Sequence, residues 1–378
     1  MANKPPATIK KHFKKLQDPR TGNATEHVFL DILVITICAV ICGADGWTEV
    51  QVWGEANQEW LRTFLELPSG IPSHDTFGRV FAQIDPAQFG KCFRSWIRAI
   101  SKLTQGQVVA IDGKKLRRSL DRPGNKKAIW MVSAWASANQ AVWGQTKIKD
   151  KSNEIKAIPE LLRLLDVTGC IVTIDAIGCQ TKIAEQIVSQ GADYVLAVKE
   201  NQGKLHEDLR DLFAGYLEAG FPQVPHDYAR EVGKDHGRLE IRECWTVADP
   251  DSLAFVRQCG QWPKLQTLVM LRAERQVNGK RSVETRYYIS SLENDATLVL
   301  QSVRSHWGIE NKLHWVLDIA FREDESRIRK DHAPENMAIV RHIALNLLKR
   351  ETTAKVGIKA KRFKANCDRK YLLKVLRS

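Results

Sequence analysis

The fold is decided by residues 170–198, CIVTIDAIGCQTKIAEQIVSQGADYVLAV. A four-residue run, Ile171 to Ile174, stops at Asp175 and predicts a short buried strand. We expect a helix from about Cys179 to Gln190 and a second strand over Asp193 to Val198. A strand, a helix and a strand in succession are typical of an α/β sheet.

Three further strands are expected before this unit. Val108 to Ile111 is an apolar run that ends at Asp112, and strand-like patterns cover Ala128 to Ala138 and Ala141 to Ile148. A helix is expected from about Glu154 to Leu165. Consecutive strands followed by strand–helix–strand alternation predict a mixed α/β sheet with flanking helices.

The rest of the chain divides into different kinds of segment. Residues 1–104 predict an all-helical domain, either a DNA-binding head or a packing domain. Residues 105–350 contain the sheet, with a β-rich insertion at about 216–290 and helices after it. Residues 351–378 carry nine Lys or Arg against two acids and are expected to be a basic C-terminal tail.

Composition favours a polyanionic partner inside the cell. The chain has 57 Lys and Arg against 44 Asp and Glu, a formal net charge of +13, which suits binding to phosphates. Its eight cysteines are scattered, which indicates a reducing cytoplasm. The longest apolar stretch, Ile32 to Ala44, is far shorter than the ~20 residues needed to cross a bilayer.

Two carboxylates, Asp112 and Asp175, directly follow apolar strands. Open α/β sheets place ligand sites at such strand ends, so neighbouring strands would bring the two carboxylates to one point. Two close carboxylates repel each other unless a cation lies between them. Carboxylate oxygens are the usual protein ligands of Mg²⁺.

A third acid lies in a helical segment rich in His and Trp, residues 305–318. At helical spacing, His306, Glu310 and His314 fall near one face. The two histidines are two turns apart, too far for the usual helical zinc pair, so we expect this polar stripe to line a cleft. The buried side of this helix is expected to consist of Trp307, Ile309, Leu313, Val316 and Leu317.

Five motifs in order resemble one family. They are AIDGK at 110–114, TIDAIGCQ at 173–180, VKENQ at 198–202, HGRLEIR at 236–242 and HWGIENKLHW at 306–315. Together they resemble the H-repeat-associated insertion-sequence transposases, which are bacterial DDE enzymes linked in some genomes to Rhs elements. The resemblance covers roughly residues 5–350.

The resemblance implies an RNase H-like core with a β-rich insertion before the last catalytic helix. It implies that Asp112, Asp175 and Glu310 are the catalytic, metal-binding carboxylates. The Tyr–Arg–Glu–Lys signature of neighbouring families is not kept, since Val303, His306 and Leu317 replace its Tyr, Arg and Lys. Competing acids follow Glu310, and these are Asp318, Glu323, Asp324 and Glu325.

The expected function is DNA cleavage and strand transfer of an insertion sequence, with two Mg²⁺ (or Mn²⁺) ions per site. The partners would be double-stranded terminal-repeat and target DNA, bound by a homodimer in the bacterial cytoplasm at the nucleoid, with no membrane contact. Expected DNA contacts are Lys114, Lys115, Lys199, Asn201, Arg238, Arg242, His306 and His314. Two alternatives remain open, a structure-selective nuclease on the same core and a domesticated DNA-binding protein without catalysis.

Overall fold

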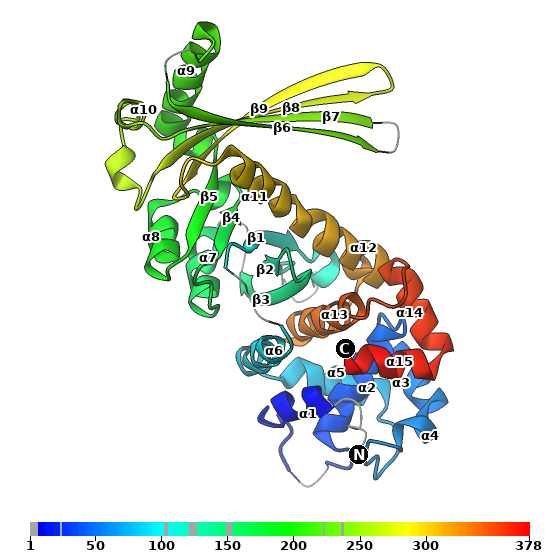
Figure 1. Cartoon of the computed structure of the whole chain (residues 1–378). Coiled ribbons are helices and arrows are strands. Elements are labelled where there is room, and N and C mark those ends of the chain that lie inside the picture. Colours follow the sequence, from blue (N-terminus) through cyan, green and yellow to red (C-terminus); the bar gives the residue numbers. More distant parts are fainter. Residues whose placement is uncertain are drawn as a thin grey trace.

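The described strands form a single nine-stranded sheet, in the order β3-β2-β1-β4-β5-β9-β8-β7-β6 (Figure 1). The structure, a computed structural model, describes residues 7–22, 25–101, 105–120, 127–148, 153–221, 224–235 and 238–378. The predicted boundary after residue 104 and the first two residues of the fourth motif, His236 and Gly237, lie outside the described residues.

The first five strands form an RNase H-like mixed sheet, which confirms the predicted fold class. β1, β2 and β3 are antiparallel neighbours, and β4 and β5 add in parallel on the other side of β1. Their bounds are β1 Val108–Lys115, β2 Trp130–Ala136, β3 Ala141–Ile148, β4 Ile171–Ile174 and β5 Asp193–Val198. β1 extends past the predicted apolar run because its polar end pairs with β2, as in Asp112 opposite Ser133.

Helices cover both faces of this sheet. α7 (Glu154–Arg163) and α8 (Thr181–Ser189) pack on one face, and α11 (Ala296–Ile309) contacts β1 and β4 from the other. Side chains alternate between the faces, as expected for a strand. Ile171 and Val195 belong to the cluster that contains α11, while Val172 and Leu196 belong to the main core.

The predicted β-rich insertion continues the same sheet as a four-stranded extension. β9 pairs antiparallel with β5, and β8, β7 and β6 follow as hairpins. The elements of this part are α9 Gly203–Ala219, β6 His226–Asp235, β7 Arg238–Val247, α10 Pro250–Phe255, β8 Thr267–Val277 and β9 Lys280–Ser290. The ends of the hairpins project away from the rest of the protein (Figure 1).

The N-terminal helices form a module with the C-terminal ones. Its members are α1 Ala7–Phe13, α2 Phe29–Ile41, α3 Trp47–Ala56, α4 Gln58–Leu61, α5 His74–Gln83, α6 Pro86–Ile100, α13 Ala333–Arg350, α14 Ile358–Cys367 and α15 Arg369–Arg377. Ser73 and Asp85 cap α5 and α6 through their side chains, as expected of these residues before a helix. None of the helices in the described ranges is long and apolar enough to span a membrane.

Residues 358–377 are therefore helical and packed, although their charge suggested a tail. α14 contacts α2, α12 (Trp315–Phe321) and α13. Arg362 is buried, and its guanidinium donates hydrogen bonds to the main-chain oxygens of Val40, at 2.9 and 3.1 Å, and of Ala320. A basic residue thus helps to fix α14 in the interior.

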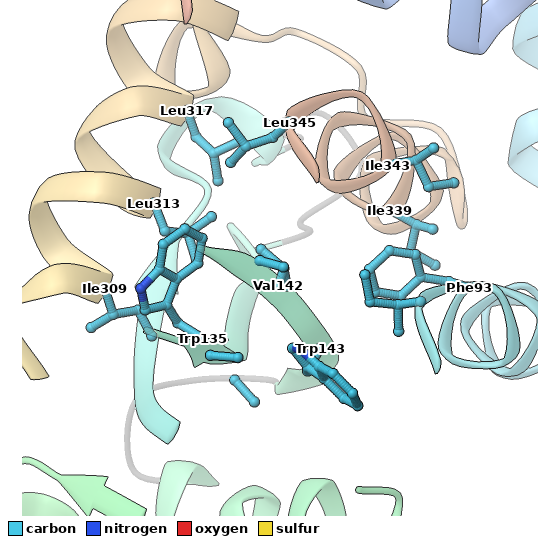
Figure 2. Packing of buried hydrophobic residues seen from close by; sticks show 14 of the residues in the cluster. Phe93, Trp135, Val142, Trp143, Ile309, Leu313, Leu317, Ile339, Ile343 and Leu345 are labelled. Carbon is cyan, nitrogen blue, oxygen red and sulfur yellow. The ribbon is translucent and has the colours of Figure 1, made fainter. Parts of the chain in front are cut away.

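A shared core joins this helical module to the sheet (Figure 2). Trp135 of β2 packs beside Ile309 and Leu313, and Ile339 of α13 lies near Phe93 of α6; all five are buried. α13 thus contacts both β3 of the sheet and the N-terminal helices α2, α5 and α6.

Candidate active site

Asp112 and Asp175 lie side by side at one edge of the parallel strand pair. β1 and β4 pair in register up to Ile111 opposite Ile174, and each aspartate is the next residue along its strand. The prediction that neighbouring strands bring these two carboxylates to one point therefore agrees with the geometry. Asp112 lies inside β1 and Asp175 directly after β4.

Asp112 is largely enclosed by the protein. Its Oδ1 accepts a hydrogen bond of 2.8 Å from the Gly113 amide, and its Oδ2 lies 3.4 Å from Nδ1 of His314. Burial and the nearby Asp175 carboxylate raise the pKa of Asp112 to about 7. Burial and Lys114 lower the pKa of His314 to about 3, so the imidazole is neutral and adds no compensating charge.

The turn after Asp175 fixes the second carboxylate. Asp175 caps a short helix and accepts a hydrogen bond of 3.2 Å from the Ile177 amide. Asn201 donates to the main-chain oxygen of Ala176 at 2.6 Å, which ties the turn to the segment after β5. A Cβ at Gly178 would lie 2.2 Å from Ile174 Cγ2, so only glycine fits this close approach.

Glu310 begins a π-helical segment, Glu310–His314, between α11 and α12. The predicted stripe at i, i+4 and i+8 therefore does not persist as a regular α-helical face. His306 shares a hydrogen bond of 3.0 Å with the Thr173 hydroxyl beside Asp175, and His314 meets Asp112, while Glu310 is exposed between them. Such π segments are often found at functional sites.

The electrostatic surroundings of Glu310 link it to Asp175 and to the extension. Burial and repulsion from Asp175 raise its pKa, and Arg286 of β9 acts in the opposite sense. Arg286 stacks over Trp307, with its guanidinium carbon 4.8 Å from the ring centroid. Trp307 is 38% exposed, so the prediction that it lies on the buried side of the helix is wrong. Its ring faces the Arg286 guanidinium at the protein surface.

The competing acids are engaged elsewhere. Lys114 pairs with Asp318 and, at 2.8 Å, with Glu323, while Asp324 pairs with Arg117 and Glu325 with Arg322. Within the described part of the chain, Glu310 is the one acid of this group without an ion pair.

Four of the eight residues predicted to contact DNA have partners within the protein around the two aspartates, although Asn201 is itself exposed. Their partners are Asp318 and Glu323 for Lys114, Ala176 for Asn201, Thr173 for His306 and Asp112 for His314. Lys115, Lys199 and Arg238 are exposed, and Arg242 is half-buried. The DNA contacts of all eight stay predictions.

An arginine cluster surrounds Glu240 on the extension. Arg275 and Arg238 pair with its Oε1 at 2.8 and 3.2 Å, and Arg242 pairs with its other oxygen. Three guanidinium groups on one carboxylate leave a local charge of 3 − 1 = +2. Cys244, two residues from Arg242 and hence on the same face, packs in the cluster that contains α11. The arginines thus lie on the α11 side of the sheet.

The two aspartates suit a hard cation because both offer oxygen, and because their mutual repulsion would be relieved by positive charge. Among the described residues, no three His, Cys, Asp or Glu side chains are gathered as a metal cluster. The exposed Glu310 carboxylate would have to turn toward the aspartates to complete such a set.

Sequence reasoning missed three site residues. The buried Glu154 of α7 lies against Gly113, where an added Cβ would come within 2.8 Å of its Oε1, and it adds to the raised pKa of Asp112. Arg275 and Arg286 come from strands whose register places them beside Glu240 and Trp307. The five motifs contain none of the three, and strand register is not visible in local sequence.

Comparisons with known proteins cover most of the chain. Residues 104–347 match the family model described as "Transposase DDE domain", and residues 10–97 match its associated domain, "DDE_Tnp_1-associated". The H repeat-associated putative transposase YhhI of Escherichia coli K12 is 41% identical over 97% of both chains. The putative transposase YncI of Escherichia coli O157:H7 is 41% identical over 96% of this chain and 93% of its own length. Among solved structures, a piggyBac transposase synaptic complex with hairpin DNA aligns with 95% of this chain and 75% of its own, with 11% identity and a TM-score of 0.42.

Proposed function

Since this chain belongs to the family of DDE transposases that includes the H repeat-associated proteins, we propose that it cuts the ends of its own insertion sequence and joins them to target DNA. The catalytic carboxylates in this proposal are Asp112, Asp175 and Glu310. The observation that carries it is the register of β1 and β4, which sets two carboxylates side by side at a strand edge under the helix bearing Glu310.

The three carboxylates would hold Mg²⁺ or Mn²⁺, two ions per site. The chemistry that bound ions supply is activation of water or a 3′-hydroxyl and stabilisation of the leaving oxygen. The protein's own part is to hold Asp112 and Asp175 rigidly on strands, through Gly113 and the Ala176 turn. Glu310 supplies the third carboxylate from an exposed position, where it can close on the site once DNA arrives.

Phosphates would be held by the basic residues that face outward. Lys115, Lys199, Arg238 and Arg242 are the proposed DNA contacts, and the net charge of +13 supplies long-range attraction. Arg238 and Arg242 are preorganised by Glu240, which lowers the entropy lost when they meet a phosphate. We place the flanking DNA along the α11 side of the extension, with two copies of the chain pairing two ends.

The decisive experiment is cleavage of DNA that carries the element's terminal repeats. We expect Mg²⁺- or Mn²⁺-dependent nicking and 3′-end joining, both reduced on the order of 10³-fold or more in Asp112→Asn and Asp175→Asn. Asp166→Asn, on the loop after α7 and away from the strand edge, is the matched control. If the Asp112 variant cleaves like the wild type at equal protein level, the assignment is wrong.

Two outcomes of the same assay identify the alternatives. Nicking without strand transfer would identify a nuclease. Equal binding of terminal DNA with and without Mg²⁺, with no nicking, would identify a binding protein. Mass photometry with labelled ends tests the proposed pairing, which predicts a complex of two chains and two DNA ends.

A further inference from the structure

The strand that carries Asp112 is cross-linked at two points to the helical segment that carries Glu310. His314, four residues after Glu310, places Nδ1 3.4 Å from Asp112. Asp318, one further turn along, pairs with Lys114, two residues after Asp112. Alternate residues of a strand share a face, so both links join the same face of β1 to the same helix.

The second link is anchored deeply. Lys114 is 11% exposed and pairs with Glu323 at 2.8 Å, and Glu323 in turn lies 3.7 Å from Nη1 of the buried Arg341 on α13. Two cations and two carboxylates balance each other, as buried charges must. The ammonium group therefore joins β1 to α12 and to Glu323, and Glu323 extends the network to Arg341 of α13.

The space beside this network is too small for DNA. A cavity of about 10 Å³ is lined by Lys114, Ser133, His314, Glu323 and His342 among others. That volume holds about one water molecule, whereas a phosphate group needs several times as much. The Lys114 ammonium is therefore directed at Asp318 and Glu323 and not at a space that could hold a phosphate group.

We propose that Lys114 is a positioning residue, which sets the separation of Asp112 and Glu310 by fixing β1 to the Glu310 helix through Asp318 and Glu323. This rests on the proposed function, because it matters only if the two carboxylates act on one metal site. Supporting partners of this kind typically change metal affinity by about 10- to 100-fold when removed.

The test compares Lys114→Met with Lys147→Met in the full-length protein. Lys147 of β3 pairs with Glu335 of α13 at 3.6 Å, so it is another lysine of the sheet that pairs with a helix carboxylate, two strands away from β1. Three quantities are measured: affinity for terminal DNA in EDTA at several salt concentrations, the Mn²⁺ concentration for half-maximal thermal stabilisation without DNA, and the cleavage rate at saturating DNA.

We expect Lys114→Met to bind DNA like the wild type with an unchanged salt dependence. Its half-maximal Mn²⁺ concentration should rise about 10-fold or more, with a matching fall in cleavage rate. Lys114→Arg should restore part of both, since a guanidinium can still bridge two carboxylates. Lys147→Met should leave the Mn²⁺ response unchanged.

Two results would overturn the proposal. If Lys114→Met loses DNA affinity and its salt slope falls by about one, Lys114 is a phosphate contact. If it matches the wild type in all three measurements, the cross-link has no role. If Lys114→Met does not fold, the same measurements are made on Asp318→Asn, which keeps the Lys114–Glu323 pair. Its half-maximal Mn²⁺ concentration should also rise. A wild type without any Mn²⁺ response or cleavage would instead refute the proposed function.

Discussion

Arg362→Ala should destabilise the whole helical module. Arg362 belongs to a strongly basic segment, yet its side chain is buried in that module. Its guanidinium donates to the main-chain oxygens of Val40 and Ala320, pairs with Asp45 at 3.3 Å and stacks over Phe321 at 4.3 Å from the ring centroid. Alanine removes the packing and leaves buried acceptors and a half-buried carboxylate without their main donor.

The expected loss follows from these contacts. Breaking a buried charge pair by removing one partner costs about 3–5 kcal/mol. Asp45 keeps some solvent contact, and Val40 still accepts from the Gly43 amide at 3.3 Å, so we take the lower end, about 3 kcal/mol. At about 2 °C per kcal/mol this lowers the unfolding midpoint by roughly 6 °C.

The measurement is thermal and urea unfolding followed by far-ultraviolet circular dichroism. The matched control is Arg322→Ala, because Arg322 is an exposed arginine paired with the exposed Glu325. It should change stability by less than about 0.5 kcal/mol. An Arg362→Ala protein within about 1 kcal/mol of the wild type would refute the reasoning that this guanidinium is a structural anchor.

Three further predictions follow from other parts of the structure. Gly178→Ala should lower the free energy of unfolding by about 1–3 kcal/mol and slow cleavage about tenfold or more, because it displaces the turn that follows Asp175. The control, Gly215→Ala, has open space at its Cβ and should be neutral or stabilising. An equal effect of the two substitutions would contradict the packing argument. Burial and nearby lysines lower the pKa of Lys349 to about 8 in the folded protein. Between about pH 8 and 10.4 the unfolded chain therefore binds more protons than the folded one, and the free energy of unfolding should rise with pH. Lys349→Met should remove this rise and stabilise the protein at pH 7, which urea unfolding at pH 7 and 10 measures. Arg275→Glu should weaken binding of terminal DNA about tenfold and reduce the salt dependence of binding. Arg281 is an exposed arginine on the opposite face of the extension, paired with Glu274, and Arg281→Glu should have neither effect. Fluorescence anisotropy at several salt concentrations measures both, and equal losses would mean that DNA does not follow the α11 side.

The strand–helix–strand unit around Asp175 was predictable because its signals are local. The apolar run of β4 ends where the polar turn begins, and β5 has the predicted bounds of Asp193–Val198. β1 was underestimated because residues 112–115 are polar. They are held in the strand by pairing with β2, which lies about 20 residues further on.

The surroundings of Glu310 were less predictable. A spacing of four residues indicates a shared face only if every turn is α-helical, and the π segment at Glu310–His314 breaks that condition. The contacts of His306 with Thr173 and of His314 with Asp112 join positions more than 130 residues apart, so local sequence does not reveal them. For the same reason Lys114 resembled a surface lysine in sequence, since its carboxylate partners come from a distant helix and loop.

The packing of α13 and α14 against α2 also has a consequence for biosynthesis. The residues that complete the helical module are translated more than 290 residues after α2, so a nascent chain cannot finish that module until residue 362 has left the ribosome. Until then the apolar surface of α2 is available to chaperones or to other chains. The order of synthesis thus delays completion of the helical module until α14 has emerged and can pack against α2.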